Sequence, residues 1–369
     1  MSKLISLEDC LAYVIDNRGV TPHKRNTEWV DKGIPVLSAN NVKTNGLQKI
    51  DEIRYISNDI YSSWMKKPLE KGDILLTSEA PAGEVMYWDS DEKVIVGQRL
   101  YGLKIKKTIN SKYLKYYLES QIGQNEIKKH VSGSTVFGIS AKTFSNIKVS
   151  LPDRDIQDKI GEILYSIDVQ IKRNNNMVQK LQVLALHTFD YFSKENDGSN
   201  SVVLKDILIE KDKSQIQVNN VQDVTGIVPF FTSGESILYT NEKLATGFNI
   251  FLSTGGNAKV QAYYGDVSYS TDTWCVTAKN NLQFYLFGYF KHIESQMDRL
   301  YFHGTGLKHL QKPIFLKSRI NISDAVSLEK YNAVVKPIYR QISIIEQSVI
   351  HLQRLKNKLL PLLINQQLV

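Results

Sequence analysis

The residues of this chain that could do chemistry are polar and basic side chains in loops, and they suit contact with a polyanion. Base edges are recognised by side chains that pair donors with acceptors, and phosphates by Lys, Arg, Ser, Thr or backbone N–H groups. From loops of the first part of the chain we select Lys24, Arg25, Asn40, Asn41, Lys43, Ser78, Arg99, Ser132, Gly133, Ser134 and Thr135. From loops of the second part we select Ser233, Lys243, Asn257, Lys259, Thr271, Thr273, His303, Gly304, Thr305, Lys308 and His309. The net charge of +8 agrees with a polyanionic partner, nucleic acid first.

Each of these residues also has a simpler explanation. A single Lys or Asn in a loop can be a solvated residue, and the Gly-Ser loop at 132–135 can be a plain turn before a strand. His303 and His309 fit structural histidines better than metal ligands. Arg99, which follows Gly97 and Gln98, is our first candidate for a base contact in the first half.

The signatures of catalysis are missing. The sequence has no NPPY or DPPY loop of an amino-methyltransferase, no GxGxxG after a strand and no HExxH. GSTVFG (133–138) has the glycine spacing of a phosphate loop, but Ile139 and Ser140 stand where Lys and Ser or Thr should follow. Pro152-Asp153 opens a long helical stretch, so acidic capping explains it better than a nuclease motif. We expect no catalytic, cofactor-binding or metal site in this chain.

The composition indicates a protein of the reducing cytoplasm. Cys10 and Cys275 are far apart, which disfavours a disulfide framework. The N-terminus lacks the apolar segment of a signal peptide, and no window approaches the roughly 18 apolar residues of a membrane span.

Residues 153–191 predict a long helix that positions the loops. Apolar residues alternate at steps of four and three, which is the heptad seam of a coiled coil. The seam consists of Ile160, Leu164, Ile167, Ile171, Val178, Leu181, Ala185 and Phe192. Asn174 interrupts it, at a position where a polar residue can fix the register.

The same pattern returns 171 residues later. The second seam consists of Tyr331, Val335, Ile338, Ile342, Ile345, Val349, Leu352, Lys356, Leu359 and Leu363. At the same offset GSTVFGISAKTFSNIKVSLP (133–152) matches GTGLKHLQKPIFLKSRINIS (304–323). We interpret this as an internal duplication of a domain followed by a helix, with Pro337 a kink or early break of the second helix.

The segments between the helices predict an α+β fold in two copies. In the first copy we expect a helix from Ser6 through Val14, strands within 33–42, 71–88 and 94–105, and a helix over 111–127. The strand region 94–105 is either a strand pair or one bulged strand around Gly97. The second copy repeats the order within 226–234, 246–264, 269–279 and 282–300, after a polar linker at 194–201. The expected parts are a first domain (1–152), a helix (153–195), a second domain (196–325) and a helix (326–369).

This organisation resembles the specificity (S) subunit of type I restriction-modification systems over essentially the whole chain. The family-like pieces are GIPVLSANNV, KGDILLT, HVSGSTVFGISAKTFSNIKVSLPDRDIQDKIGEIL and LQRLKNKLLPLLINQQL. The second copy departs from the third piece, with Gly304-Thr305-Gly306 for the Ser-rich loop and Ile322-Ser323 where Leu151-Pro152 stand.

The resemblance implies that each domain is a target recognition domain for one half of a bipartite, asymmetric DNA site. The two helices would form an antiparallel intrachain coiled coil that sets the spacer. Modification (methyltransferase) subunits would hold S-adenosylmethionine and methylate adenine, and restriction subunits would use ATP; this chain would bind neither cofactor. The outer helix faces, with Lys172, Arg173, Arg340 and Arg354, would meet the modification subunits.

Two other functions stay open. The chain could be the specificity partner of a related two-chain restriction enzyme, in which methylation and cleavage lie together in the other chain. It could also be a coiled-coil scaffold that binds proteins through its two globular parts.

Overall fold

The computed structural model describes residues 2–132, 138–194, 200–221, 226–234 and 236–367. The chain forms two compact units, one made of Met1–Gln170 and Gln353–Val369 and the other of Ile171–Leu352. Two long helices, α5 (Arg154–Lys194) and α9 (Ala325–Ile364), contribute residues to both units.

The first unit is an α+β domain whose main sheet has four antiparallel strands in the order β2-β10-β7-β8. A three-stranded sheet, β6-β3-β9, pairs β3 with β9 in parallel, and β1-β11 and β4-β5 are two-stranded. The strands are β1 (Lys3–Ser6), β2 (Leu11–Asp16), β3 (Ile34–Leu37), β4 (Val42–Lys43), β5 (Gly46–Leu47), β6 (Arg54–Ile56), β7 (Ile74–Thr77), β8 (Val85–Tyr87), β9 (Ile95–Val96), β10 (Leu100–Ile105) and β11 (Lys148–Leu151). The shorter helices are α1 (Leu7–Cys10), η1 (His23–Arg25), η2 (Ile50–Glu52), η3 (Asn58–Ile60), α2 (Tyr61–Trp64), α3 (Ser111–Glu119), α4 (Gln121–Lys129) and η4 (Ala141–Ser145).

The predicted helix from Ser6 to Val14 is correct only in its first turn. Ser6 is the N-cap, since its side chain accepts a hydrogen bond from the Asp9 backbone N–H. The helix ends at Cys10, and Leu11 already pairs with Ile105 of β10. Pairing with a strand about 90 residues later overrides the local helical pattern, because a half-buried strand and a short amphipathic helix share such apolar spacing.

Two further expectations are corrected. Residues 94–105 do contain two strands, but β9 and β10 do not pair with each other, since β9 pairs with β3 while β10 pairs with β2 and β7. The expected helix over 111–127 is two helices, because Ser120 ends α3 and its hydroxyl caps α4 by accepting from the Gly123 N–H.

The second unit repeats this topology. Its main sheet has the order β13-β19-β16-β17, and its second sheet, β15-β14-β18, again contains one parallel pair, β14 with β18. The strands are β12 (Ser201–Val203), β13 (Leu208–Glu210), β14 (Val228–Phe231), β15 (Leu238–Thr240), β16 (Phe248–Ser253), β17 (Val260–Tyr264), β18 (Ser268–Tyr269), β19 (Thr273–Ala278), β20 (Phe302–His303), β21 (His309–Leu310) and β22 (Arg319–Asn321). The helices are α6 (Leu204–Ile207), η5 (Val218–Asn220), α7 (Gln283–Tyr301) and α8 (Lys312–Leu316). Strand order, direction and the mixed second sheet agree between the units, so the fold is a structural repeat.

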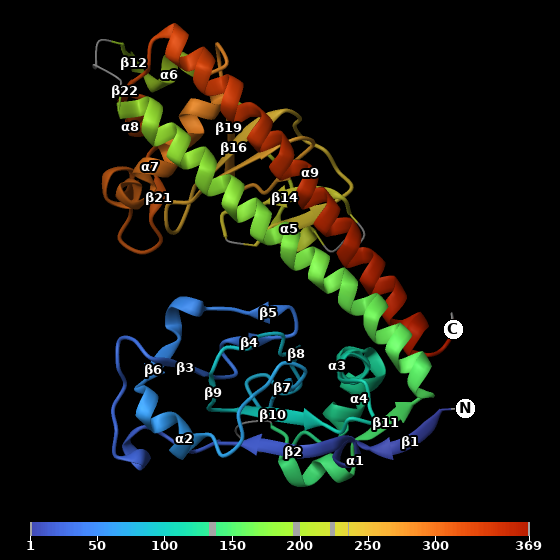
Figure 1. Ribbon diagram of the computed structural model, residues 1–369. Helices are drawn as coiled ribbons and strands as arrows, with labels where there is room; N and C mark the ends of the chain where they lie inside the picture. The colour runs from blue at the N-terminus through green and yellow to red at the C-terminus, as the bar shows by residue number, and fades with distance from the viewer. Residues whose placement is uncertain (1, 133–137, 195–199, 222–225, 235, 368–369) are drawn as a thin grey trace. The chain divides into compact units, whose positions relative to one another are not determined.

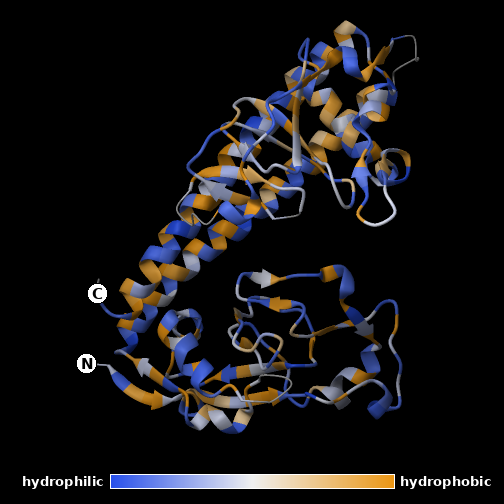
Figure 2. Ribbon diagram, turned by 180° about the vertical axis from the view of Figure 1, so that it is seen from behind, coloured by the Kyte–Doolittle hydropathy of each residue, from blue (hydrophilic) through white to orange (hydrophobic). Residues whose placement is uncertain are grey.

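The long helices pair within each unit, and the pair is antiparallel. In the second unit Asn174 Nδ2 donates to Ser348 Oγ at 3.3 Å, and the Phe192 and Tyr331 rings lie 5.8 Å apart. Residues with higher numbers on α5 therefore contact residues with lower numbers on α9. In the first unit Ile160 and Leu164 of α5 share one core cluster with the end of α9. Figure 2 shows hydrophobic and hydrophilic residues alternating along both helices, as an amphipathic pair requires.

Pro337 neither ends nor interrupts α9, which corrects the expected early break. Among the described residues, no helix combines the length and the apolar content needed to cross a membrane.

Candidate nucleic-acid interface

In the first unit the predicted loops meet at one edge of the main sheet. At this edge β2 and β7 end and β10 begins, so the segments after Asp16, after Thr77 and before Leu100 lie together (Figure 1). The Ser78 N–H donates to the Arg99 carbonyl at 2.9 Å, and the Ile139 N–H donates to the Ser78 carbonyl at 2.8 Å. Residues that are distant in sequence therefore form one surface, which we call the first loop cluster (17–27, 38–44, 78–83, 97–99, 132 and 138–139).

Gln98 holds this cluster together. Its Nε2 donates to the Val20 carbonyl at 2.7 Å, and its Oε1 accepts from the Gly19 N–H at 3.2 Å. Its own carbonyl accepts from the Ala39 N–H at 3.2 Å. Because both ends of its side chain bond to the 19–20 backbone and its carbonyl bonds to Ala39, Gln98 holds these loops in place beside Arg99.

The basic residues predicted in the first unit lie on this cluster. Lys24 Nζ donates to the Gly19 carbonyl at 2.8 Å, and Lys43 Nζ donates to the Ala39 carbonyl at 3.1 Å. Arg25 lies half-buried in η1 beside the exposed Lys24, and Asn40 is exposed. These bonds to loop carbonyls fix where the ammonium groups sit.

Arg99 is the most available arginine of the cluster. Its side chain is 52% exposed, and its Nε lies 3.7 Å from Glu79 Oε2, a loose ion pair. The backbone of Arg99 has a φ of 58°, in the left-handed region that side chains rarely adopt. Such a conformation costs about 1 to 3 kcal/mol and occurs preferentially at functional sites.

The Gly-Ser loop begins at this surface. Ser132 and Gly138 exchange two backbone hydrogen bonds, of 2.9 and 3.0 Å, and Glu79 forms a bridge with Gly138. The predicted contacts Gly133, Ser134 and Thr135 lie outside the described residues, so they stay a prediction.

Arg18 belongs to the cluster but was missed in the sequence. It forms a bidentate ion pair with Asp16, in which Nε donates to Oδ1 at 2.8 Å and Nη2 donates to Oδ2 at 2.9 Å. Its guanidinium carbon lies 4.2 Å from the centre of the Tyr101 ring. Burial opposes the charge of Asp16, but hydrogen bonds from Arg18 hold the pKa of that carboxyl below its ordinary value. The turn sequence Asp16-Asn17-Arg18-Gly19, which places a basic residue in a loop, was the signal available.

Three predicted contacts are enclosed, which changes the role we assign them. Asn41 is 3% exposed, accepts from the Ser38 N–H and hydroxyl, and donates to the Lys49 carbonyl. Thr273 is 5% exposed, with its hydroxyl bonded to Ser270. Ser78 is 1% exposed, and its Oγ has no hydrogen-bond partner among the described residues. These residues support the loops rather than contacting a ligand directly.

The second unit builds an equivalent surface around the Asp272 carbonyl. This oxygen accepts from the Ser233 hydroxyl, from the Thr254 N–H at 3.1 Å and from Thr254 Oγ1 at 2.7 Å. Lys259 Nζ donates to the Gly234 carbonyl at 3.0 Å. We call the loops 232–234, 254–259, 270–273 and 303–310 the second loop cluster.

A hairpin completes the second cluster and carries most of the remaining predicted residues. The Gly256 N–H donates to the Lys308 carbonyl, and the Leu310 N–H to the Thr254 carbonyl, both at 3.0 Å. His303 pairs with His309 between β20 and β21. The exposed residues of this hairpin and its neighbouring loop are Asn257, His303, Gly304, Thr305, Gly306, Leu307, Lys308 and His309. Leu307, 66% exposed at the tip, is an apolar residue in a polar loop that we did not select.

Two other predicted residues of the second unit, Thr271 and Lys243, lie outside this hairpin. The Thr271 N–H donates to the Ile216 carbonyl at 3.0 Å, and Thr271 is half-buried beside Asp272. Lys243 lies apart from the cluster's bonded loops, in an exposed ion pair of 3.5 Å with Asp266. Across the described residues, no three His, Cys, Asp or Glu side chains group as metal ligands would.

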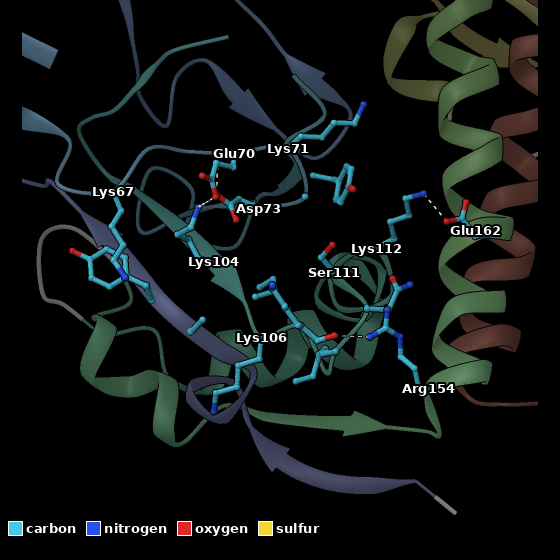
Figure 3. A pocket seen from close by; sticks show the side chains of 18 residues that line it. Lys67, Glu70, Lys71, Asp73, Lys104, Lys106, Ser111, Lys112, Arg154 and Glu162 are labelled. Carbon is cyan, nitrogen blue, oxygen red and sulfur yellow. Dashed lines mark hydrogen bonds and ion pairs between the residues drawn. The ribbon is translucent and has the colours of Figure 1, made fainter. Parts of the chain in front are cut away.

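A basic pocket occupies the opposite end of the first unit's sheet. Its volume is about 660 Å³, and its cationic lining residues are Lys67, Lys71, Lys104, Lys106, Lys107, Lys112 and Arg154 (Figure 3). Several of these charges are already neutralised. Lys104 Nζ lies 2.7 Å from Glu70 and 2.9 Å from Asp73, and Lys112 lies 2.6 Å from Glu162. We therefore place the candidate interface at the loop clusters.

The comparisons with known proteins agree with this organisation. Residues 4–183 match the family model of the type I restriction modification DNA specificity domain. The chain is 29% identical over 157 residues to the type I restriction enzyme MjaVIII specificity subunit of Methanocaldococcus jannaschii, which is 40% of this chain and 36% of that protein. It is 30% identical over 120 residues to the MjaIX specificity subunit of the same organism, 32% of this chain and 27% of that protein. The matches thus span about a third of the length of these curated relatives.

The fold comparison extends over the whole chain. The crystal structure of the type I restriction-modification system S subunit from M. genitalium superposes with a TM-score of 0.65 at 12% identity, covering 98% of this chain and 96% of that one. The fold is therefore that of an S subunit, with two repeated α+β domains and an antiparallel intrachain helix pair. The resemblance is confirmed, because residues 4–183 match the type I restriction modification DNA specificity domain and the curated relatives with similar sequences are type I specificity subunits.

Proposed function

We propose that this chain is the non-catalytic DNA-recognition subunit of a type I restriction-modification complex. The observation that carries the proposal is the pair of loop clusters. Both lie at the same edge of the same sheet in the two copies of the fold, and both present basic and polar side chains on exposed loops. Rigid sheets with variable loops suit recognition of different ligands on one scaffold.

Each cluster would recognise one half of a bipartite site. The two clusters differ in their exposed side chains, so the two half-sites should differ in sequence. Two domains that contact the same side of a duplex need a separation near one helical turn, roughly 34 Å. The antiparallel helix pair would set this spacing, and removing one heptad from each helix, about 10 Å at 1.5 Å per residue, should shorten the preferred gap by a few base pairs.

The chemistry would come from partner chains. Modification subunits would hold S-adenosylmethionine and methylate adenine, and restriction subunits would use ATP, in the cytoplasm. Lys172 and Arg173 are exposed on α5 and remain candidates for docking the modification subunits. Arg340 is a weaker candidate than expected, because its Nη2 donates to the Tyr264 hydroxyl at 2.9 Å and is thus engaged with its own unit.

The decisive experiment is adenine methylation mapping in cells that express this chain together with its cognate modification subunit. The control cells lack only this chain. We expect a split, asymmetric motif that appears only when the chain is present, and exchange of residues 1–152 should change one half of it. No motif, with the modification subunit bound and active, would contradict the proposal.

Methylation mapping separates the scaffold, and a cleavage assay of the bound partner chain separates the two-chain enzyme. A coiled-coil scaffold would give no motif and only salt-driven DNA binding without sequence preference. A two-chain restriction enzyme would give the motif, but its single partner chain would both methylate and cleave.

A further inference from the structure

We propose that Arg99 and Asp272 occupy the same position in the two copies of the fold and set the difference between the two half-sites. Arg99 would contact a guanine, and Asp272 would accept a hydrogen bond from the exocyclic amino group of a cytosine. The inference rests on the proposed function and deepens it by naming one specificity-determining residue in each half.

The equivalence of the two positions follows from strand register. Leu100 of β10 pairs with Thr77 of β7, and Thr273 of β19 pairs with Ser253 of β16. Arg99 precedes Leu100 as Asp272 precedes Thr273. Both residues therefore stand immediately before the same strand of the same sheet.

The backbone hydrogen bonds at the two positions are also the same. The Arg99 carbonyl accepts from the Ser78 N–H at 2.9 Å, and the Asp272 carbonyl accepts from the Thr254 N–H at 3.1 Å. Two residues earlier, the Gly97 N–H donates to the Leu37 carbonyl of β3 at 2.9 Å.

In the second unit the corresponding bond runs from the Ser270 N–H to the Phe231 carbonyl of β14, again at 2.9 Å. The backbone therefore places Arg99 and Asp272 at the same edge of the main sheet in their units, with the same hydrogen bonds.

The neighbouring loop is built alike in both copies. In the first, Thr77 Oγ1 donates to the Pro81 carbonyl at 2.7 Å and accepts from the Glu84 N–H at 2.9 Å. In the second, Ser253 Oγ donates to the Asn257 carbonyl at 2.8 Å and accepts from the Lys259 N–H at 2.9 Å. One hydroxyl thus closes a short loop beside each proposed base-contacting residue.

The two side chains differ in charge, and both are available. Within the part of the chain that the structure describes, the Arg99 side chain has only the loose contact with Glu79. Asp272 is exposed, and its carboxylate has neither a hydrogen bond nor an ion pair among the described residues, although three hydrogen bonds hold its carbonyl. A fixed backbone with a free side chain is the arrangement that base recognition requires.

The chemistry of the two side chains suggests opposite base partners. A guanidinium donates twice to O6 and N7 of guanine, which is the commonest specific contact in the major groove. A carboxylate is repelled by phosphates, so beside DNA it is useful where it accepts from an amino group, as from N4 of cytosine. Lys259 and Lys308 in the same cluster supply the positive charge that phosphate contact needs.

The test uses methylation mapping with the full chain and its modification subunit. Asp272→Asn keeps the size of the side chain but adds a donor, which suits adenine N6 and N7. We expect preference for cytosine at one position of one half-site to fall roughly tenfold or more, the range that one good base contact provides, with the other half-site unchanged. Arg99→Gln should shift one position of the other half-site from guanine towards adenine.

Matched variants control the interpretation. Glu242→Gln changes an exposed carboxylate of the same unit outside the cluster and should leave the motif unchanged. Asp272→Glu keeps the charge and should retain the preference for cytosine. Asp272→Ala, which removes the carboxylate, replaces Asp272→Asn if that variant fails to fold. A wild-type motif that neither the Asp272→Asn or Asp272→Ala variant nor Arg99→Gln alters would overturn this inference alone, whereas a motif independent of the chain would overturn the proposed function.

Discussion

Lys356 Nζ of α9 lies 2.7 Å from Asp168 Oδ1 of α5 and 2.8 Å from Glu119 Oε1 of α3. Lys115 Nζ also lies 3.0 Å from Asp168 Oδ2, and the Tyr116 hydroxyl donates to the same carboxylate oxygen at 2.7 Å. Lys356 occupies a position of the otherwise apolar seam. Its ammonium group can be largely buried there because it forms ion pairs with two carboxylates. This network joins both long helices to the α+β domain of the first unit.

Replacing Lys356 with methionine should destabilise the first unit. The change leaves Asp168 and Glu119 with only Lys115 as a cationic partner, and breaking such a largely buried network should cost roughly 1 to 3 kcal/mol of unfolding free energy. Chemical denaturation measures the loss. Lys358→Met, at an exposed position two residues later, is the matched control. Equal stability of the two variants would show that the network contributes nothing.

The same network predicts a loss of stability in acid. Burial opposes ionisation of Asp168, but Lys115 and Lys356 hold the pKa of its carboxyl below the ordinary 3.8. A depressed pKa stabilises the folded state above pH 4, and this contribution disappears as pH falls through the folded value. Asp168→Asn should remove this part of the pH dependence in unfolding measured from pH 6 to 2. A variant with an unchanged acid slope would contradict this assignment.

Because of Glu346, we expect stability in the second unit to depend on pH in the opposite direction. Burial on α9 raises the pKa of its carboxyl to about 7. Because the folded state then binds the proton more tightly than the unfolded chain, stability should fall as pH rises from 4.5 to 7. Glu346→Gln should flatten this slope and stabilise the protein by roughly 1 to 3 kcal/mol at pH 8. Glu329→Gln, exposed on the same helix, should leave the slope as it is.

Asn174 should limit the stability of the helix pair. Its amide donates to Ser348 across the seam, where apolar residues stand at neighbouring positions. Asn174→Ile should raise the unfolding free energy by roughly 1 kcal/mol, while removing the polar contact that fixes the register. Denaturation of this variant beside Asn175→Ile, on the exposed face, measures the gain. A gain in both variants would point to helix propensity instead.

Lys24 should contribute to DNA affinity without changing sequence preference. Removing one phosphate contact should weaken binding to all duplexes and lower the slope of log affinity against log salt by about 1. Titration of Lys24→Ala with duplexes at several salt concentrations measures both. Lys106→Ala, in the pocket at the other end of the same sheet, should behave as wild type. Equal losses in both variants would remove the loop cluster as the DNA surface.

The sequence identified features that depend on local periodicity or on self-similarity. The seam of α5 was predictable because the a and d positions of each heptad face the partner helix whatever the rest of the fold does. The repeat was predictable because it needs no coordinates, and the matching sheet orders confirm it. The loop residues could be selected by type, since donors and acceptors of the right kind are visible in sequence.

Other features depended on distant pairing. Residues 11–16 form β2 instead of the expected helix because they pair with β10. The strand β9 does not pair with β10 because it pairs with β3. Asn41 and Thr273 have suitable chemistry but are enclosed, which only packing could decide.

By itself the sequence determined the repeat, the two long helices and the basic, polar character of the loops, because these are properties of residue type and spacing along the chain. The tertiary structure alone decided which loop residues share a surface, which of them are exposed, and that Arg99 and Asp272 occupy one equivalent position. The reason is physical: strand register and hydrogen bonds between segments far apart in the chain place those side chains, and local sequence does not encode such pairings.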